Sequence, residues 1–305
     1  FELGNYYYDL GFNFLALQEY QIIVGKYRGS PHAKESLFKI GRCYDRLKDS
    51  ESARRAYFQF LCSYPKDLLV ADALLSIGDS LMEQGLYNKA LDIYEKVIRE
   101  FANDDSGATT KAQFNIAKAY MKMGDYRNAI QVFLKARWKY CSDQRRAEIE
   151  YQIGNCLYLL NEYQDASNVL GNYLVNEEEG EFGENAIFLL GDCFYKLDNY
   201  LGAFQIFRKA TERYSKSNKV PGGIYCMGKS LRAMNMPESA IKILREGLQA
   251  FPVDDTAGKM AFEIGMCYFD KGDYCLAYNA FDSFVKQYPQ DELVVEAMIV
   301  MSDAL

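Results

Sequence analysis

Hydrophobic and polar positions recur along the chain with a period of 37 residues. Seven glycines and one alanine are the anchors of this pattern, and successive anchors are 37, 37, 39, 37, 37, 37 and 37 residues apart. Alanine stands twelve residues after every anchor, and large apolar residues stand three and sixteen residues after it. This agreement predicts a repeat array. The anchors are Gly4, Gly41, Gly78, Ala117, Gly154, Gly191, Gly228 and Gly265.

Each unit predicts two antiparallel helices. Apolar residues flank the anchor at helical spacing, as Leu37, Ile40 and Tyr44 do around Gly41. A glycine inside a helix costs about 1 kcal/mol relative to alanine, so its recurrence indicates a helix contact that leaves no room for a Cβ atom. We expect the recurrent alanine to lie where the second helix crosses the first.

The first helix of each unit is expected to stop seven residues after the anchor. In seven units the residue there tolerates the left-handed backbone conformation that ends many helices, and Lys48 is the exception. The eight residues are Gly11, Lys48, Gly85, Gly124, Asn161, Asp198, Asn235 and Gly272. The predicted units are roughly 1–30, 31–67, 68–106, 107–143, 144–180, 181–217, 218–254 and 255–291, with a partial ninth at 292–305.

The pattern resembles a tetratricopeptide repeat (TPR) array over nearly the whole chain. The small, aromatic, alanine, aromatic and proline positions of that family fall on the offsets above. The resemblance implies an all-α, right-handed superhelical solenoid of about eight helix-turn-helix units, with residues 1–305 forming a single array. The long period, the Tyr-Pro endings and the opening from Ile40 to Tyr44 are similar to TPR proteins of the bacterial cell envelope. Those include the β-barrel assembly lipoprotein and the coordinator of the Tol–Pal system.

Two stretches depart from the period, and we expect a change of curvature or a loosened joint at them. Residues 103–110 carry two extra positions, and residues 176–184 form an acidic loop. Neither end of the chain reads as a polar capping helix, which repeat arrays normally have. We therefore expect a fragment of a longer protein, whose targeting sequence is not visible here.

Composition narrows the function classes. Hydrophobic residues make up 49% of the chain and charged residues 25%, as in a folded soluble protein. No apolar run is long enough to span a membrane. A net charge of −7 argues against binding to nucleic acid, and a single histidine removes most metal and acid–base chemistry. We expect no catalytic residues, no cofactor and no metal site.

The cysteines are expected to be free, buried thiols. Four of the eight share the position two residues after the anchor, where stacked helices place them about 8–10 Å apart, beyond disulfide reach. Such usage mildly favours a reducing compartment, whereas the family resemblance favours the periplasm or cell envelope, so the cytoplasm stays open as the alternative. The cysteines are Cys43, Cys62, Cys141, Cys156, Cys193, Cys226, Cys267 and Cys275.

Two further features have ordinary structural interpretations. His32 follows a Ser-Pro pair and is expected to be a surface residue at a helix start, since no catalytic motif surrounds it. A basic cluster interleaved with aromatic residues is expected to be solvated helix ends rather than a site for nucleic acid or anionic lipid. This cluster comprises Lys135, Arg137, Trp138, Lys139, Tyr140, Arg145 and Arg146.

The TPR resemblance implies that the first helices line a concave face, with residues three before and four after the anchor directed inward. The earlier row is expected to serve partly in helix packing, and the later row to be more exposed. Asn155 has the chemistry to hydrogen-bond the backbone of an extended peptide, while rings bury its side chains and charges orient it. The predicted partner-binding residues are Tyr151, Asn155, Tyr158, Phe188, Asp192, Tyr195 and Lys196.

We therefore expect a non-catalytic scaffold that binds a peptide or a partner protein on the concave face, in a bacterial envelope or motility assembly. A cytoplasmic adaptor or co-chaperone is the first alternative, and the regulatory domain of an enzyme outside this segment is the second. The clamp by which chaperone-type TPR domains hold a C-terminal carboxylate needs lysine three residues before the anchor. That position is aromatic or leucine in every unit, which disfavours this mode.

Overall fold

The computed structural model describes residues 1–102, 107–137, 143–177 and 179–303, and within them all regular secondary structure is helical. The predicted all-α repeat solenoid is confirmed. The helices are α1 (Glu2–Asp9), α2 (Asn13–Lys26), α3 (Pro31–Arg46), α4 (Ser50–Ser63), α5 (Val70–Glu83), α6 (Tyr87–Glu100), α7 (Ala108–Lys122), α8 (Tyr126–Arg137), α9 (Asp143–Leu159), α10 (Tyr163–Glu177), α11 (Gly183–Lys196), α12 (Tyr200–Arg213), α13 (Val220–Ala233), α14 (Pro237–Ala250), α15 (Ala257–Asp270), α16 (Tyr274–Gln287) and α17 (Val294–Asp303).

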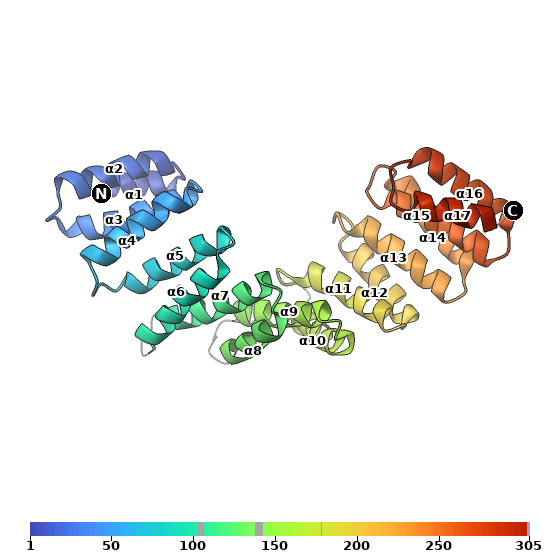
Figure 1. The fold of residues 1–305 in the computed structure, drawn as a ribbon, viewed down its shortest axis with the longest axis horizontal. Helices are drawn as coiled ribbons and strands as arrows, with labels where there is room; N and C mark the ends of the chain where they lie inside the picture. The colour runs from blue at the N-terminus through green and yellow to red at the C-terminus, as the bar shows by residue number, and fades with distance from the viewer. Residues whose placement is uncertain (103–106, 138–142, 178, 304–305) are drawn as a thin grey trace. The chain divides into compact units, whose positions relative to one another are not determined.

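The chain divides into two compact units. Residues 1–142 hold α1 to α8, and residues 143–305 hold α9 to α17 (Figure 1). Within each unit, consecutive helices pack against one another, odd-numbered helices being the first and even-numbered ones the second of each repeat. The division falls between the fourth and fifth predicted repeats. It coincides with neither of the two irregular stretches, 103–110 and 176–184, at which we expected a joint.

The anchor glycines make the close contact that their recurrence predicts. A Cβ atom on Gly191 would lie 2.7 Å from Cε1 of Phe207, and one on Gly41 would lie 2.5 Å from Cε1 of Tyr57. Both rings belong to the residue sixteen positions later, on the second helix. The recurrent alanines are fully buried in all eight units. Side-chain volume at these two positions therefore sets how closely the two helices of a repeat approach.

All eight residues seven positions after the anchor have a positive φ angle. Lys48 is among them, with a φ of 61°, so the backbone follows the repeat where the residue type does not. The turn is stabilised by two backbone hydrogen bonds. The Lys48 N–H donates to the carbonyl of Asp45 at 3.1 Å, and the Asp49 N–H donates to that of Tyr44 at 3.0 Å. This is the Schellman motif that ends helices with a left-handed residue.

Candidate functional site

The two rows of residues on the first helices differ in exposure. Five residues three positions before the anchor are buried: Phe38, Leu75, Phe114, Phe188 and Phe262. These five side chains therefore serve mainly in helix packing, which was expected of this row only in part. All eight residues four positions after the anchor are half-buried: Tyr8, Asp45, Met82, Met121, Tyr158, Tyr195, Arg232 and Phe269. The later row is the more exposed one, as predicted.

The unit of residues 143–305 has a group of such side chains on its first helices. We name it the α9–α13 face, because its residues come from the first helices α9, α11 and α13. All of its members are half-buried, so each presents part of its surface while its remainder is fixed by packing. The face consists of Tyr151, Asn155, Tyr158, Asp192, Tyr195, Tyr225 and Lys229.

Two tyrosines of the face each make an edge-to-face ring contact with a second tyrosine, and the contact recurs from one repeat to the next. The rings of Tyr158 and Tyr163 meet edge to face, with centroids 5.5 Å apart, and the Tyr163 hydroxyl donates to Oδ1 of Asn161 at 2.5 Å. One repeat later, Tyr195 meets Tyr200 at 5.4 Å in the same geometry. Aromatic contacts of this kind fix ring orientation before any partner arrives. Tyr163 and Tyr200 are not among the predicted site residues, although both stand nine residues after an anchor.

Tyr151 and Phe188 have different roles, although both stand three residues before an anchor. The Tyr151 ring stacks on Phe182 with centroids 4.9 Å apart and stays half-buried. The Phe188 ring is only 8% exposed. It packs so closely on Gly223 that a Cβ atom there would lie 2.8 Å from Cε1 of the ring. Phe188 thus packs beneath the face, and its ring is not accessible to a partner, which differs from its predicted role.

The charged residues at this face are Asp192, Lys196 and Lys229. The Lys229 ammonium lies 4.7 Å from the centroid of the Tyr195 ring and 5.4 Å from that of Tyr225, in cation–π contact with both. Burial raises the pKa of Asp192 to about 6, although Lys196 and Lys229 attract its ionised form. Lys196 itself is exposed at the end of α11. The charge on this face therefore changes near pH 6.

Asn155 lies between Tyr151 and Tyr158 along α9 and is half-buried. No other described residue hydrogen-bonds to its side-chain amide. The same holds for the Asp192 carboxylate. A half-buried amide and a half-buried carboxylate have most of their hydrogen-bonding capacity left for a ligand. These two groups are the polar contacts that the α9–α13 face offers.

An ion-pair cluster continues the same side of the molecule from α13 to α15. The Arg232 guanidinium donates to the Glu263 carboxylate, Nε to Oε1, at 2.5 Å and to the Asp270 carboxylate at 2.9 Å. Glu263 is 3% exposed, and its pKa is raised by burial and held down by Arg232. Because Arg232 pairs with both carboxylates, this cluster joins the neighbouring repeats through ion pairs.

The unit of residues 1–142 has a pocket of about 790 Å³ on its first helices. Its basic lining residues are Lys34, Lys39, Arg42 and Arg46, and its acidic ones are Glu35, Asp45 and Asp67. The Arg46 guanidinium lies 3.6 Å from the centroid of the Tyr8 ring and donates to the Tyr8 carbonyl at 2.6 Å. Arg42 lies 5.6 Å from the Phe38 ring. Most of these charged side chains interact with other residues of the pocket, so fewer of them are available to a ligand than the volume suggests.

The thiols agree in part with the prediction. All seven described cysteines are free, and Cys43, Cys156, Cys193 and Cys267 have no exposed surface. Burial raises the pKa of the last three to about 12. Cys62 and Cys275 are exposed, because they lie on outward-facing positions of second helices, and so depart from the expected burial. The eighth, Cys141, lies outside the described residues.

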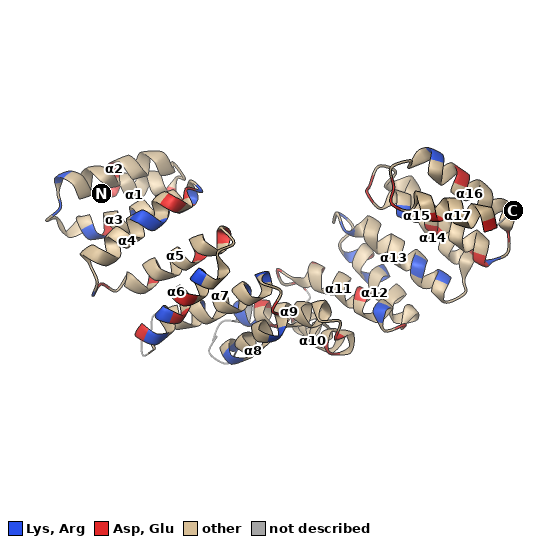
Figure 2. Cartoon of the chain, in the orientation of Figure 1, with Lys and Arg blue, Asp and Glu red and all other residues tan. Residues whose placement is uncertain are grey.

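The described members of the remaining sequence candidates lie near helix ends. His32 lies in the first turn of α3, where its backbone N–H donates to the N-cap hydroxyl of Ser30 at 3.2 Å. Lys135 and Arg137 end α8, and Arg145 and Arg146 begin α9, whereas Trp138, Lys139 and Tyr140 lie outside the described residues. Basic and acidic residues are interspersed along the helices of both units (Figure 2). Among the described residues, no histidine, cysteine and carboxylate cluster has metal-site geometry, and no helix qualifies as a membrane span.

Sequence profiles and solved structures identify the repeat. Profiles described as tetratricopeptide repeat match residues 1–66, 185–217 and 261–291. TPR proteins from Cytophaga hutchinsonii and Parabacteroides merdae superpose with TM-scores of 0.60 and 0.57, each at 15% identity. They cover 97% and 89% of this chain, which in turn covers 98% and 99% of theirs. These matches support a TPR repeat array with the fold of a TPR solenoid. TPR proteins generally mediate protein–protein interactions.

One further profile, one partial relative and one further solved structure are similar to parts of the chain. A profile described as anaphase-promoting complex, cyclosome, subunit 3 matches residues 83–173. The outer dynein arm-docking complex subunit 4 of Danio rerio is 29% identical over 144 residues, which are 45% of this chain and 29% of that protein. The match thus spans less than a third of that relative. YrrB, described as a TPR protein with an unusual peptide-binding site, has a TM-score of 0.50 at 18% identity and covers 68% of this chain and 97% of its own.

Proposed function

We propose that the array is a non-catalytic scaffold that binds an extended segment of a partner protein on the α9–α13 face. The observation that carries this proposal is the combination of fixed rings with unused polar groups. Tyr158 and Tyr195 are held edge to face, while the Asn155 amide and the Asp192 carboxylate form no hydrogen bond with any described residue. Rigid aromatic side chains lose little entropy on binding, which suits them as contacts with high binding energy.

An extended segment fits this face better than a helix does. Asn155 can accept a hydrogen bond from a backbone N–H and donate one to a backbone carbonyl, and only an extended chain leaves those groups unused. The tyrosine rings then bury alternate side chains of that segment. Lys229 and Lys196 favour an acidic residue near Tyr195, which sets the direction of the bound chain more than its affinity.

The test begins with a partner captured from the source organism on the full chain and identified by mass spectrometry. Its affinity is then measured by calorimetry for the wild type and for Tyr158→Ala and Tyr195→Ala. Each variant is expected to weaken binding by about 1–2 kcal/mol, roughly fivefold to thirtyfold, without loss of helicity. The matched control is Leu201→Ala, which truncates an exposed apolar residue on α12. If both tyrosine variants bind normally and Leu201→Ala does not, the second helices carry the site.

A role as a subunit of a larger assembly is a second proposal. The partial relative is named as a subunit of a docking complex, and one matching profile is named after a subunit of the anaphase-promoting complex. Such a role needs stable rather than transient association. Co-purification of the endogenous, tagged protein at a fixed stoichiometry would support it, whereas elution of the tagged protein alone would count against it.

The cellular setting also stays a proposal. We keep the bacterial cell envelope as the first setting, on the resemblance described under the sequence analysis, with a cytoplasmic adaptor or an enzyme's regulatory domain as the alternatives. The full-length open reading frame distinguishes them. A signal peptide or lipid-anchor motif supports the envelope, its absence supports the cytoplasm, and an appended catalytic domain supports the regulatory role.

A further inference from the structure

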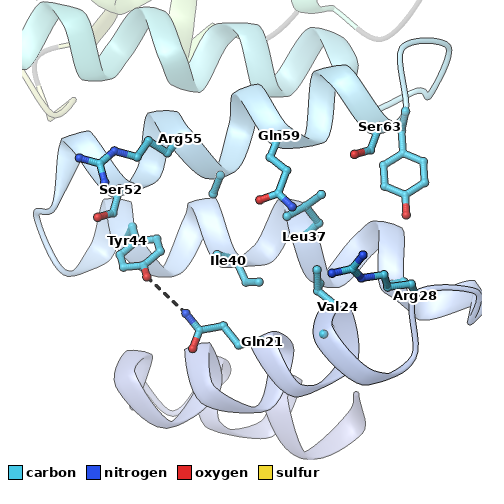
Figure 3. Close-up of a pocket in the computed structure, with 14 residues that line it drawn as sticks. Gln21, Val24, Arg28, Leu37, Ile40, Tyr44, Ser52, Arg55, Gln59 and Ser63 are labelled. Atoms are coloured by element: carbon cyan, nitrogen blue, oxygen red, sulfur yellow. Dashed lines mark hydrogen bonds between the residues drawn. The ribbon is translucent and has the colours of Figure 1, made fainter.

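A second groove lies on the opposite side of the first repeats, between the second helices α2 and α4. It has a volume of about 550 Å³, and Leu37 and Ile40 of α3, with Val24 of α2 beside them, form its apolar floor (Figure 3). Gly25 lies at its edge, where an added Cβ atom would meet nothing within 4 Å. The groove is thus separate from both the α9–α13 face and the pocket on the first helices of residues 1–142.

The charge of this groove is opposite to that of the chain. The array has a net charge of −7, yet the groove is lined by two arginines and by no carboxylate. Arg28 forms no ion pair with any described carboxylate. Arg55 pairs with Glu51 of its own helix, but both side chains are largely exposed, at 73% and 67%. An exposed pair of this kind contributes little, so a ligand carboxylate can replace Glu51 at small cost.

The walls carry neutral hydrogen-bonding groups along the groove. Gln21 donates its amide to the Tyr44 hydroxyl at 3.3 Å, and both side chains face the opening (Figure 3). Gln59 and Ser63 stand across from them on α4, and no described residue hydrogen-bonds to their side chains. Amides and hydroxyls in a row complement the free N–H and C=O groups of an extended chain, whereas a helix has already satisfied its own.

We propose that this groove binds an extended acidic segment of a partner protein. Carboxylates of the segment pair with Arg28 and Arg55, which lie toward opposite ends of the groove, and an apolar side chain between them rests on the Val24, Leu37 and Ile40 floor (Figure 3). Arginine favours this role because its planar donors match a carboxylate in two-point contact. The array then has two separate surfaces for protein segments, one in each compact unit.

The corresponding groove between α12 and α14 shows that this chemistry is not a property of every repeat. It has a volume of about 440 Å³ and is lined mainly by large apolar side chains, among them Leu201, Phe204, Met234 and Met236. Its charged lining residues are one lysine and one glutamate, Lys242 and Glu246. The two grooves therefore differ in their lining chemistry, although both lie between second helices.

The test uses the full chain and defined peptide libraries. The probe is a mixture of fluorescein-labelled octapeptides with two glutamates separated by two to five residues and one Leu, Ile, Val or Phe between them. The reference mixture replaces each glutamate by glutamine. Binding is followed by fluorescence anisotropy, and the site is located by shifts of the methyl resonances of Val24, Leu37 and Ile40.

We expect the glutamate mixture to bind at least tenfold more tightly than the glutamine mixture and to shift the three floor methyls. The double variant Arg28→Ala/Arg55→Ala should lose most of this preference. Arg42→Ala, which removes an exposed arginine from the first-helix side of α3, should change the affinity less than twofold.

Three outcomes would overturn the proposal: equal binding of the two mixtures, no binding of the glutamate mixture, or a loss caused by Arg42→Ala rather than by the double variant. The exposed positions of both groove arginines make misfolding an inadequate explanation, and circular dichroism of each variant checks this directly. Tyr158→Ala serves as an internal reference. It should leave peptide binding in this groove unchanged, so failure here and failure of the α9–α13 proposal give different results.

Discussion

Replacing Lys48 by glycine should stabilise the second repeat, which tests whether all eight turns share one backbone conformation. Lys48 has a φ of 61°, a region in which a residue with a Cβ atom pays about 1–2 kcal/mol. Glycine avoids that cost but loses more chain entropy on folding, about 0.5–1 kcal/mol. The Lys48–Glu83 ion pair, 3.9 Å long with side chains 80% and 58% exposed, adds little. The net expected gain is about 0.5–1 kcal/mol.

Two comparisons isolate the backbone effect from the loss of the lysine side chain. Lys48→Ala removes the same ion pair but keeps the strained conformation, so Lys48→Gly should be about 1 kcal/mol more stable than Lys48→Ala. Lys96 lies inside α6, where the helix geometry is ordinary. There the order should reverse, with the alanine variant more stable than the glycine variant by about 1 kcal/mol.

Because repeat arrays can unfold unit by unit, the readout should be local. Native-state hydrogen exchange of amides in α3 and α4 reports the second repeat directly. A gain of about 1 kcal/mol corresponds to roughly fivefold slower exchange of those amides. If Lys48→Gly exchanges faster than Lys48→Ala, the residue does not adopt the left-handed conformation and the shared turn geometry is wrong.

Three other perturbations test the packing and the charge of the array. Gly191→Leu should lower the free energy of unfolding by about 1–3 kcal/mol or more, and Gly191→Ala should lower it less, because alanine already stands at the fourth anchor. Hydrogen exchange should become faster first in α11 and α12. A uniform increase across the chain would contradict the repeat packing. Cys193 should resist alkylation until denaturation while Cys62 reacts at once, and rapid labelling of native Cys193 would refute its burial. Burial raises the pKa of Asp192 to about 6 from 3.8, so its contribution to stability is greatest below pH 3.8 and is lost as pH rises to about 6. Asp192→Asn should therefore stabilise the unit at pH 7 and reduce the dependence of its urea midpoint on pH between pH 4 and 6. An unchanged dependence on pH would count against the raised pKa of Asp192.

The repeat could be predicted from the sequence because its signals are short-range and occur eight times. The anchors, the recurrent alanine and the helix-ending turns each depend on one steric requirement, and the structure confirms all three. Lys48 shows the limit of reasoning by residue type. Its turn is imposed by the helices on both sides, so tertiary packing overrides the local preference of lysine.

The candidate site could be predicted only in outline. The offset from the anchor correctly identified the half-buried row with Tyr158 and Tyr195, since periodicity determines which way a helical side chain points. It did not separate Phe188 from Tyr151, because their difference depends on Gly223 in the next repeat. Contacts between repeats, such as Lys229 over the Tyr195 ring, likewise follow from stacking and not from any spacing within one unit.

Side-chain footprinting of the partner complex tests the binding surface most directly. The full chain is labelled by a photogenerated carbene with and without its captured partner, and modification is measured by mass spectrometry at individual residues. The account predicts that Tyr158, Tyr195 and Tyr225 become protected while Leu201 on α12, which is 56% exposed, stays equally labelled. Protection of Leu201 with unchanged labelling of the three tyrosines would contradict the assignment of the α9–α13 face.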